Sequence, residues 1–235
     1  MSRAEPLQQK GEYYSIKDGS FRLPSEQGNP KAIRREYTNP KTKESGVAYE
    51  LGFGALSGLI KDIRFHENTL KDGTVLRSMN IILDENEENK LPIISLPIDS
   101  RYTSDFLKKL PNIDLEKEVR FQPYDFDPKE GARQVGISIT QPDDTENFSV
   151  KIFNFFLEEG EPGEDGRKVY KNLHGFPEPT EEDKEDWKFY FAKVNKFLVK
   201  YVKENILPKF ASLEHDKAID RAIPEDGIDP KDIPF

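Results

Sequence analysis

Basic side chains gather around an aromatic ring in one short stretch of this 235-residue chain. Residues 31–43 contain five basic residues and one acid, and Tyr37 lies beside Arg34 and Arg35. A local excess of positive charge can follow a phosphate backbone, and an exposed ring can stack on a nucleobase. The chemistry that these residues favour is therefore nucleic-acid binding.

Similar pairings of rings and cations recur further along the chain. Tyr49 and Phe53 share a predicted strand face with apolar neighbours, so core packing is favoured over stacking there, whereas Tyr37 has charged neighbours that favour exposure. Tyr13 and Tyr14 must point to opposite faces of a strand, which leaves one exposed. The full set of candidate DNA-binding residues is Arg34, Arg35, Tyr37, Lys41, Lys43, Tyr49, Phe53, Arg64, Phe65, Lys71, Arg77, Arg120, Tyr124 and Arg133.

The residue types that would support catalysis or metal binding are absent or scattered. His66, His174 and His215 lack ligand spacing, and the chain has no Gly-rich phosphate loop or nucleophile motif. The absence of cysteine excludes disulfides, thiolate metal sites and cysteine nucleophiles. A two-metal nuclease would need paired carboxylates, which cannot be picked out among 44 acids. We expect no enzyme, no cofactor and no metal.

The charge balance and the hydropathy further restrict the class of protein to which this chain can belong. The net charge is −9, and residues 214–235 carry seven acids and three bases, so any DNA-binding surface must be a local groove. No stretch approaches the roughly 20 apolar residues of a membrane span. Residues 1–10 lack the apolar core of a signal peptide. We expect a protein of the cytoplasm with no membrane partner.

Short β-branched and aromatic runs separated by turns dominate residues 12–141. A first strand over residues 47–65, with glycines that permit bulges, precedes strands over 74–83 and 90–97. A helix over 100–110, with Ser100 as its cap, then comes before strands over 118–124 and 134–140. Three strands, a helix and two strands is the order of a five-stranded OB barrel. Its loops between strands one and two and between four and five would form the groove walls.

Two attachments flank this predicted barrel. The turn Lys17-Asp18-Gly19 predicts a hairpin that extends the sheet. After the apolar run 148–157, in which Phe153, Phe155 and Phe156 fit either a stacking platform or core filling, a Gly-, Glu- and Pro-rich connector follows.

A long helix is predicted over residues 180–205. Thr180 is the expected cap, with Asp183 in the reciprocal position. An apolar stripe runs along it, which we expect to pack on the barrel, a nucleic-acid or partner helix being the alternative. It comprises Trp187, Tyr190, Phe191, Val194, Phe197, Leu198, Tyr201 and Val202. Lys193, Lys196, Lys200 and Lys203 form either a solvated face or a basic rail beside the groove.

The C-terminal peptide ends in Asp232-Ile233-Pro234-Phe235. It resembles the acidic tip of bacterial and bacteriophage single-stranded-DNA-binding proteins, which commonly close in these four residues. The ring of Phe235 and the terminal carboxylate suit a basic pocket on a partner, and Asp229 would help to steer the approach. Lys231 departs from the acidic pattern.

The body is also similar to phage-type single-stranded-DNA-binding proteins, in residues 13–21, 58–63, 106–114 and 172–179. The resemblance implies an OB core that coats and protects single-stranded DNA in replication, recombination and repair, in a host cytoplasm. Replication and recombination proteins would bind the tip, and self-association on DNA stays open. The alternative is an OB-like protein-interaction or duplex-binding module.

The expected organisation has five parts. Residues 1–11 form a flexible N-terminus, and residues 12–157 form the OB-fold DNA-binding domain with its N-terminal extension. A connector loop over 158–179 leads to a helix over 180–210 that packs on the barrel. Residues 211–235 form a disordered acidic tail.

Overall fold

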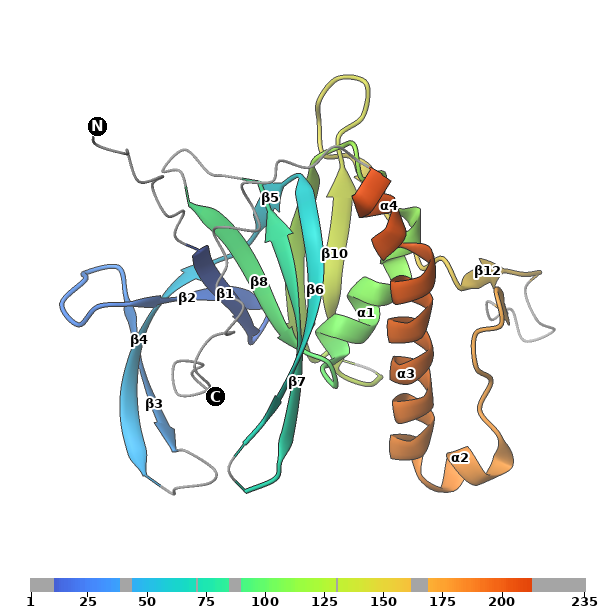
Figure 1. Ribbon diagram of the computed structural model, residues 1–235, viewed down its shortest axis with the longest axis horizontal. Coiled ribbons are helices and arrows are strands. Elements are labelled where there is room, and N and C mark those ends of the chain that lie inside the picture. Colours follow the sequence, from blue (N-terminus) through green and yellow to red (C-terminus); the bar gives the residue numbers. More distant parts are fainter. Residues whose placement is uncertain are drawn as a thin grey trace, which may run out of the picture.

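The computed structural model describes residues 11–38, 44–70, 72–84, 90–129, 131–161 and 169–212. Strands dominate, and most of the helical residues lie near the C-terminal end of the described chain (Figure 1). The prediction of a mainly β protein with a long C-terminal helix is confirmed at this level. The larger sheet is mixed, in the spatial order β3 (Ile33–Thr38), β4 (Ser45–Phe53), β2 (Ser20–Ser25), β1 (Gly11–Lys17), β8 (Leu91–Pro97), β7 (Val75–Leu83) and β6 (Ile60–Thr69).

A second, four-stranded sheet packs against the first. Its order is β11 (Val150–Lys151), β10 (Gln134–Gln141), β9 (Val119–Phe126) and β5 (Leu56–Gly58). Only Leu59 separates β5 from β6, so the two sheets are linked there. Gly58 permits this passage, because a Cβ atom at that position would lie 2.6 Å from Oδ1 of Asp84.

The predicted order of three strands, a helix and two strands is present as β6, β7, β8, α1 (Arg101–Lys109), β9 and β10. The β5–β9 pairing connects the first of these strands to the fourth. Among the described residues, no strand pairing joins β8 to β10. The pairings therefore give two open sheets and no closed barrel within the described chain.

The N-terminal hairpin forms where its turn was predicted. Asp18 and Gly19 both have positive φ, 48° and 69°, and Lys17 pairs with Ser20. Two central residues with positive φ define the turn that matches the twist of a hairpin. Beyond the hairpin, β1 pairs in parallel with β8, with Tyr13 opposite Ile93.

The predicted first barrel strand was wrong in its extent. The chain leaves the strand at residues 54–55, so that β4 lies in the N-terminal part of the sheet between β2 and β3. Phe53 lies opposite Phe21, which is fully buried, and meets Tyr14 edge to face, with 5.7 Å between ring centroids. These aromatic contacts favour pairing with β2 over a continuous strand through Gly54.

The hydrophobic core lies between the two sheets and under α1. Ser100 caps this helix as predicted, because its Oγ accepts a hydrogen bond of 3.0 Å from Thr103 N. Phe106 and Leu107 are buried, and a 3₁₀ turn (Leu110–Asn112) follows. In Figure 1, α1 lies between the strands and the C-terminal helix α3 (Trp187–Asn205).

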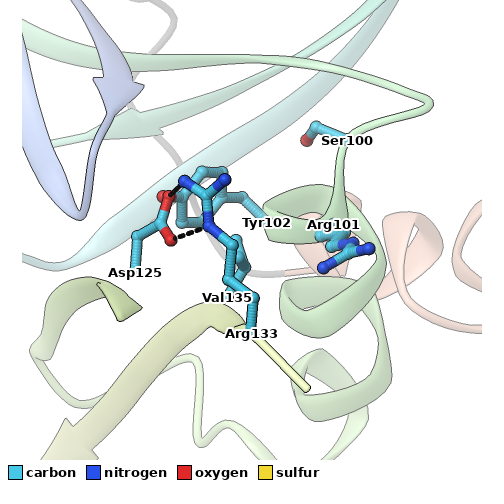
Figure 2. Close-up of a pocket in the computed structure, with 6 residues that line it drawn as sticks. All are labelled: Ser100, Arg101, Tyr102, Asp125, Arg133 and Val135. Atoms are coloured by element: carbon cyan, nitrogen blue, oxygen red, sulfur yellow. Dashed lines mark hydrogen bonds and ion pairs between the residues drawn. The ribbon is translucent and has the colours of Figure 1, made fainter. Parts of the chain in front are cut away.

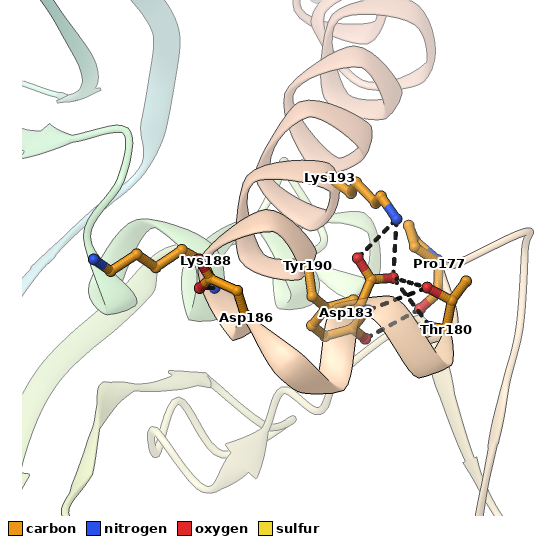
Figure 3. Close-up of polar contacts among 7 residues, drawn as sticks. All are labelled: Pro177, Thr180, Asp183, Asp186, Lys188, Tyr190 and Lys193. Carbon is orange, nitrogen blue, oxygen red and sulfur yellow. Dashed lines mark hydrogen bonds and ion pairs between the residues drawn. The ribbon is translucent and has the colours of Figure 1, made fainter.

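The predicted C-terminal helix is interrupted. The capping box of Thr180 and Asp183 opens only a short helix, α2 (Glu181–Glu185), as Figure 3 shows. Asp186 then adopts an extended conformation and caps α3, its Oδ1 accepting from Lys188 N at 2.9 Å. An Asp side chain competes for backbone donors in this way, which favours a new helix start over continuation. A final short helix, α4 (Leu207–Ser212), follows.

The apolar stripe of α3, which was expected to pack on the barrel, is buried in part. Val194, Leu198 and Val202 are buried in the core. Trp187 and Phe191, by contrast, are 46% and 57% exposed. Both rings lie in the first two turns of α3, before the first of its buried residues. None of the helices in the described ranges is long and apolar enough to cross a membrane.

The connector predicted as a loop contains a short hairpin, β12 (Leu157–Glu159) with β13 (Tyr170–Asn172). Phe156, just before it, is fully buried in the core. Phe155 stacks on His174 with 4.0 Å between the ring centroids. Of the three phenylalanines that could have formed a stacking platform, only Phe153 stands well exposed.

Candidate nucleic-acid interface

The larger sheet has one face on the core and one face turned away from it. Side chains alternate between the two faces along each strand. The register places Tyr14, Phe21 and Ile63 on the core face. The opposite face, called the outer face below, carries Tyr13, Lys17, Arg22, Arg35, Tyr37, Arg64 and His66.

A basic cluster on the outer face surrounds Glu50, which is 3% exposed. Its Oε1 accepts from Lys17 Nζ at 3.3 Å and from Arg35 Nε and NH2 at 3.2 and 3.0 Å. Burial lowers the pKa of Lys17, Glu50 raises it, and the nearby charges of Arg35 and Arg22 lower it further. Lys17 and Arg35 thus share one buried carboxylate, and Arg22 lies close enough to Lys17 for its charge to lower the pKa of that amine.

Tyr37 lies at the edge of this cluster. The Arg35 guanidinium carbon lies 5.7 Å from the centroid of the Tyr37 ring. A Cβ atom on Gly46 would lie 2.7 Å from Cζ of this ring, so the glycine allows the ring to lie close against β4. A ring held against its own sheet is pre-organised for stacking a base.

A second group lies over β1, β6 and β7. Tyr13 packs against Ile82 and Ile93, apart from the main core. Burial raises its pKa, and the charge of Arg64 opposes that shift. Arg64 Nε donates to Asp62 Oδ2 at 2.7 Å, so this cation is balanced in part by an acid.

His66 and Asn80 complete this second group. Burial, with the charge of Arg64, lowers the pKa of His66, so the imidazole is neutral at pH 7. His66 Nε2 and Asn80 Oδ1 are buried without a hydrogen-bond partner in the described part of the chain. The outer face thus combines rings, cations and polar groups from strands far apart in sequence.

Other predicted residues lie elsewhere on the larger sheet. Arg34 and Tyr49 are cross-strand neighbours on the face opposite Arg35, where Arg34 NH1 pairs with Glu36 at 2.7 Å. Arg77 pairs with Glu67 at 2.8 Å. Phe53 and Phe65 pack against the core, and Lys203 Nζ lies 5.2 Å from the centroid of the Phe65 ring.

Three further predicted residues lie on the smaller sheet or next to it. Arg120 and Tyr124 share the face of β9 that points away from the core. Arg133 holds Asp125 through two hydrogen bonds of 2.6 and 2.7 Å, which lowers the pKa of that carboxyl. Figure 2 shows this pair beside Arg101 and Tyr102, where they line a cavity of about 360 Å³.

The basic rail predicted on α3 is only partly available. Lys193 Nζ binds both carboxylate oxygens of Asp183, at 2.7 and 2.9 Å, and so ties α3 to α2 (Figure 3). Lys203 lies over the Phe65 ring. Both lysines therefore have structural contacts.

Several predicted residues fall outside the described ranges. These are Lys41, Lys43 and Lys71, and the whole proposed partner-binding tip, Asp229, Asp232, Ile233, Pro234 and Phe235. Sequence reasoning also missed two cations of the outer face, Lys17 and Arg22. The Asp-Gly turn could have indicated them, since the hairpin register it fixes puts Arg22 opposite Ser15, on the face of Lys17.

No protein family model, no curated protein and no solved structure matches this chain.

Proposed function

We propose that the protein binds single-stranded DNA on the outer face of the larger sheet, coating and protecting the strand. The observation that carries this proposal is that one sheet face carries two rings, Tyr13 and Tyr37, as well as the basic cluster around Glu50. Binders that tolerate any sequence combine cations that follow the phosphates with rings on which bases stack. The outer face offers both on one surface.

The strand order supports an OB-type interpretation of the same region. In OB folds the face of strands two and three, flanked by two loops, binds oligonucleotides. If β6, β7 and β8 are the first three OB strands, the outer face includes that surface. The hairpin β1–β2 and the strands β3 and β4 then enlarge it on one side.

The C-terminal tip would recruit partners independently of DNA. An aromatic ring preceded by acids, as in Asp232-Ile233-Pro234-Phe235, suits a basic pocket on a replication or recombination protein. Within this proposal, the body holds the strand and the tip binds partner proteins.

The first test is fluorescence-polarisation binding of labelled oligo-dT and of a duplex of equal length, at about 50 and 200 mM salt. Binding to the single strand alone, weakening as salt rises, is expected. Equal binding of the duplex, or no binding, would refute the proposal. The first result would favour a duplex-binding module and the second a protein-interaction module.

Two variants locate the site. Tyr37→Ala should weaken binding by about 1–3 kcal/mol if a base stacks there. Arg22→Ala should make the binding constant fall less steeply with salt, by the amount that corresponds to about one lost phosphate contact. Tyr170→Ala is the matched ring control, because Tyr170 is an exposed ring on β13, outside the larger sheet. An equal loss in the control would show that the outer face is not the site.

A further inference from the structure

A second concave surface lies on the smaller sheet, on the face turned away from the core. Its volume is about 520 Å³, within the range of about 300–1,000 Å³ typical of small-molecule sites. Side chains from β9, β10 and the segment after β11 line it, among them Tyr124, Phe126, Gln134, Lys151, Phe153 and Asn154. The cavity therefore has room for one nucleotide.

Two aromatic rings in this cavity are exposed. Phe126 and Phe153 are 53% and 65% exposed. Tyr124 lies next to Phe126, with 6.0 Å between the ring centroids. Lys151 Nζ lies 5.6 Å from the centroid of the Phe153 ring. Rings with an adjacent cation match a base and its phosphate.

Hydrogen bonds between α1 and β10 hold the residues at the floor of the cavity in place. Asp105 Oδ2 accepts from Ile137 N and from Lys109 Nζ, each at 2.7 Å, and Lys109 also donates to Ile137 O at 2.6 Å. A Cβ atom on Gly136 would clash with Asp105 and with the ring of Tyr124. Glycine at this position therefore fixes Tyr124 close against β10, so that stacking requires little reorganisation.

Polar groups at the rim can meet the edge of a base. Gln134 Nε2 donates to Ala132 O at 3.1 Å, and Asn154 Oδ1 accepts from Phe156 N at 2.9 Å. Each bond holds one end of an amide whose other end can still accept or donate. Amide side chains that offer both a donor and an acceptor suit the exposed edge of an unpaired base.

The first cavity separates this one from the hairpin of the larger sheet. Gly19 N, two residues after Lys17, donates to Tyr102 Oη at 3.2 Å. Tyr102 lines the first cavity together with Arg101 and Arg133 (Figure 2), and Phe126 of the second cavity follows Asp125 of the first on β9. The first cavity therefore lies between the N-terminal hairpin and the second cavity, with Arg101 and Arg133 in its lining.

We infer that this cavity is a second base-binding site for the same single strand, in which an unpaired base contacts Phe126 and Phe153 and a phosphate contacts Lys151. The inference rests on the proposed function. A strand that leaves the outer face passes Arg101 and Arg133 and reaches this site, so only oligonucleotides long enough to span both surfaces use it.

The test compares oligo-dT of about 6 and about 20 nucleotides, a range set by the site sizes of OB folds. Phe126→Ala and Phe153→Ala should each weaken binding of the long strand about 5- to 100-fold and leave the short strand unchanged. Phe189→Ala is the matched control, because this ring is exposed on α3 and lines neither cavity. It should change neither affinity.

Failure of the inference and failure of the proposed function give different results. If the wild-type protein binds both strands and the two variants bind the long strand normally, the second site is refuted and the first stands. If the wild-type protein binds no single strand, both are refuted.

Photo-cross-linking gives an independent measurement. A long strand that contains 5-iodouracil should attach to peptides with Phe126 or Phe153 after irradiation. Attachment only to peptides of the outer face would overturn the second site.

Discussion

Replacing Glu50 with glutamine should weaken the fold and strengthen DNA binding. Glu50 is nearly inaccessible and accepts three hydrogen bonds from Lys17 and Arg35. Hydrogen bonds to a charged group contribute about 1.5–3 kcal/mol each. The side-chain oxygen of glutamine can still accept these hydrogen bonds, but with the smaller contribution of an uncharged acceptor. Because both cations retain some access to water, we expect a loss of about 1–2 kcal/mol in the free energy of unfolding.

The same change removes one negative charge from beneath the proposed phosphate path. Two unit charges about 4 Å apart in water interact by about 1 kcal/mol. Glu50→Gln should therefore tighten binding of oligo-dT by up to about fivefold at low salt, with less gain at high salt. Urea unfolding measures the first effect, and polarisation at two salt concentrations measures the second.

Glu36→Gln is the matched control. Its ion pair with Arg34 is as short as 2.7 Å but exposed, and it lies on the face opposite Arg35. An exposed pair contributes about 0–1 kcal/mol, so stability and affinity should change little. If Glu50→Gln lowers DNA affinity together with stability, or leaves the affinity unchanged, the phosphates do not pass over this cluster.

Three further predictions concern the C-terminal part of the chain. Thr180→Ala removes the side-chain cap of α2 and should lower the free energy of unfolding by about 1 kcal/mol in urea, with oligo-dT affinity unchanged. Hydrogen bonds, first from Lys193, lower the pKa of Asp183 to about 2, below its value of about 3.9 in an unfolded chain. This carboxylate therefore stabilises the fold fully above about pH 4 and loses the effect as the pH falls toward 2, so Asp183→Asn should flatten the acid limb of a stability–pH curve. Deletion of Pro234 and Phe235 should spare oligo-dT binding and abolish capture of the partner, and loss of both would contradict separate roles for body and tip.

Local sequence patterns predicted the elements that depend on neighbouring residues. The Asp18-Gly19 turn, the Ser100 cap and the capping box of Thr180 with Asp183 were all located correctly. Each depends on the conformational preference or hydrogen bonding of residues within a few positions. These local preferences do not depend on the tertiary structure.

Features that depend on distant residues could not be predicted in the same way. Whether β4 continues into β5 or pairs with β2 depends on the Phe21 and Tyr14 contacts, which alternation along one strand does not reveal. Asp186 suits both a helix interior and a cap, and the tertiary arrangement decides between them.

The residues that come together in the candidate site also depend on contacts between distant parts of the chain. Arg34 and Arg35 are equal candidates by composition, yet they must point to opposite faces of β3. Only the pairing of β3 with β4 shows that Arg35 joins Glu50 and Lys17. The second cavity is lined by both Phe126 and Phe153, and a single sequence does not indicate that these residues line one cavity.

The parallel pairing of β1 with β8 also has a consequence for solubility. Residues 91–94 of β8 are all buried, and β1 occupies the edge that they would otherwise expose. An open, apolar strand edge is a template for intermolecular pairing and aggregation. The chain instead ends this sheet in β3, where Arg34, Arg35 and Glu36 are consecutive charges that oppose the addition of another strand. The N-terminal hairpin therefore protects the protein from self-assembly, and a version that begins after residue 25 should aggregate before any effect on DNA can be measured.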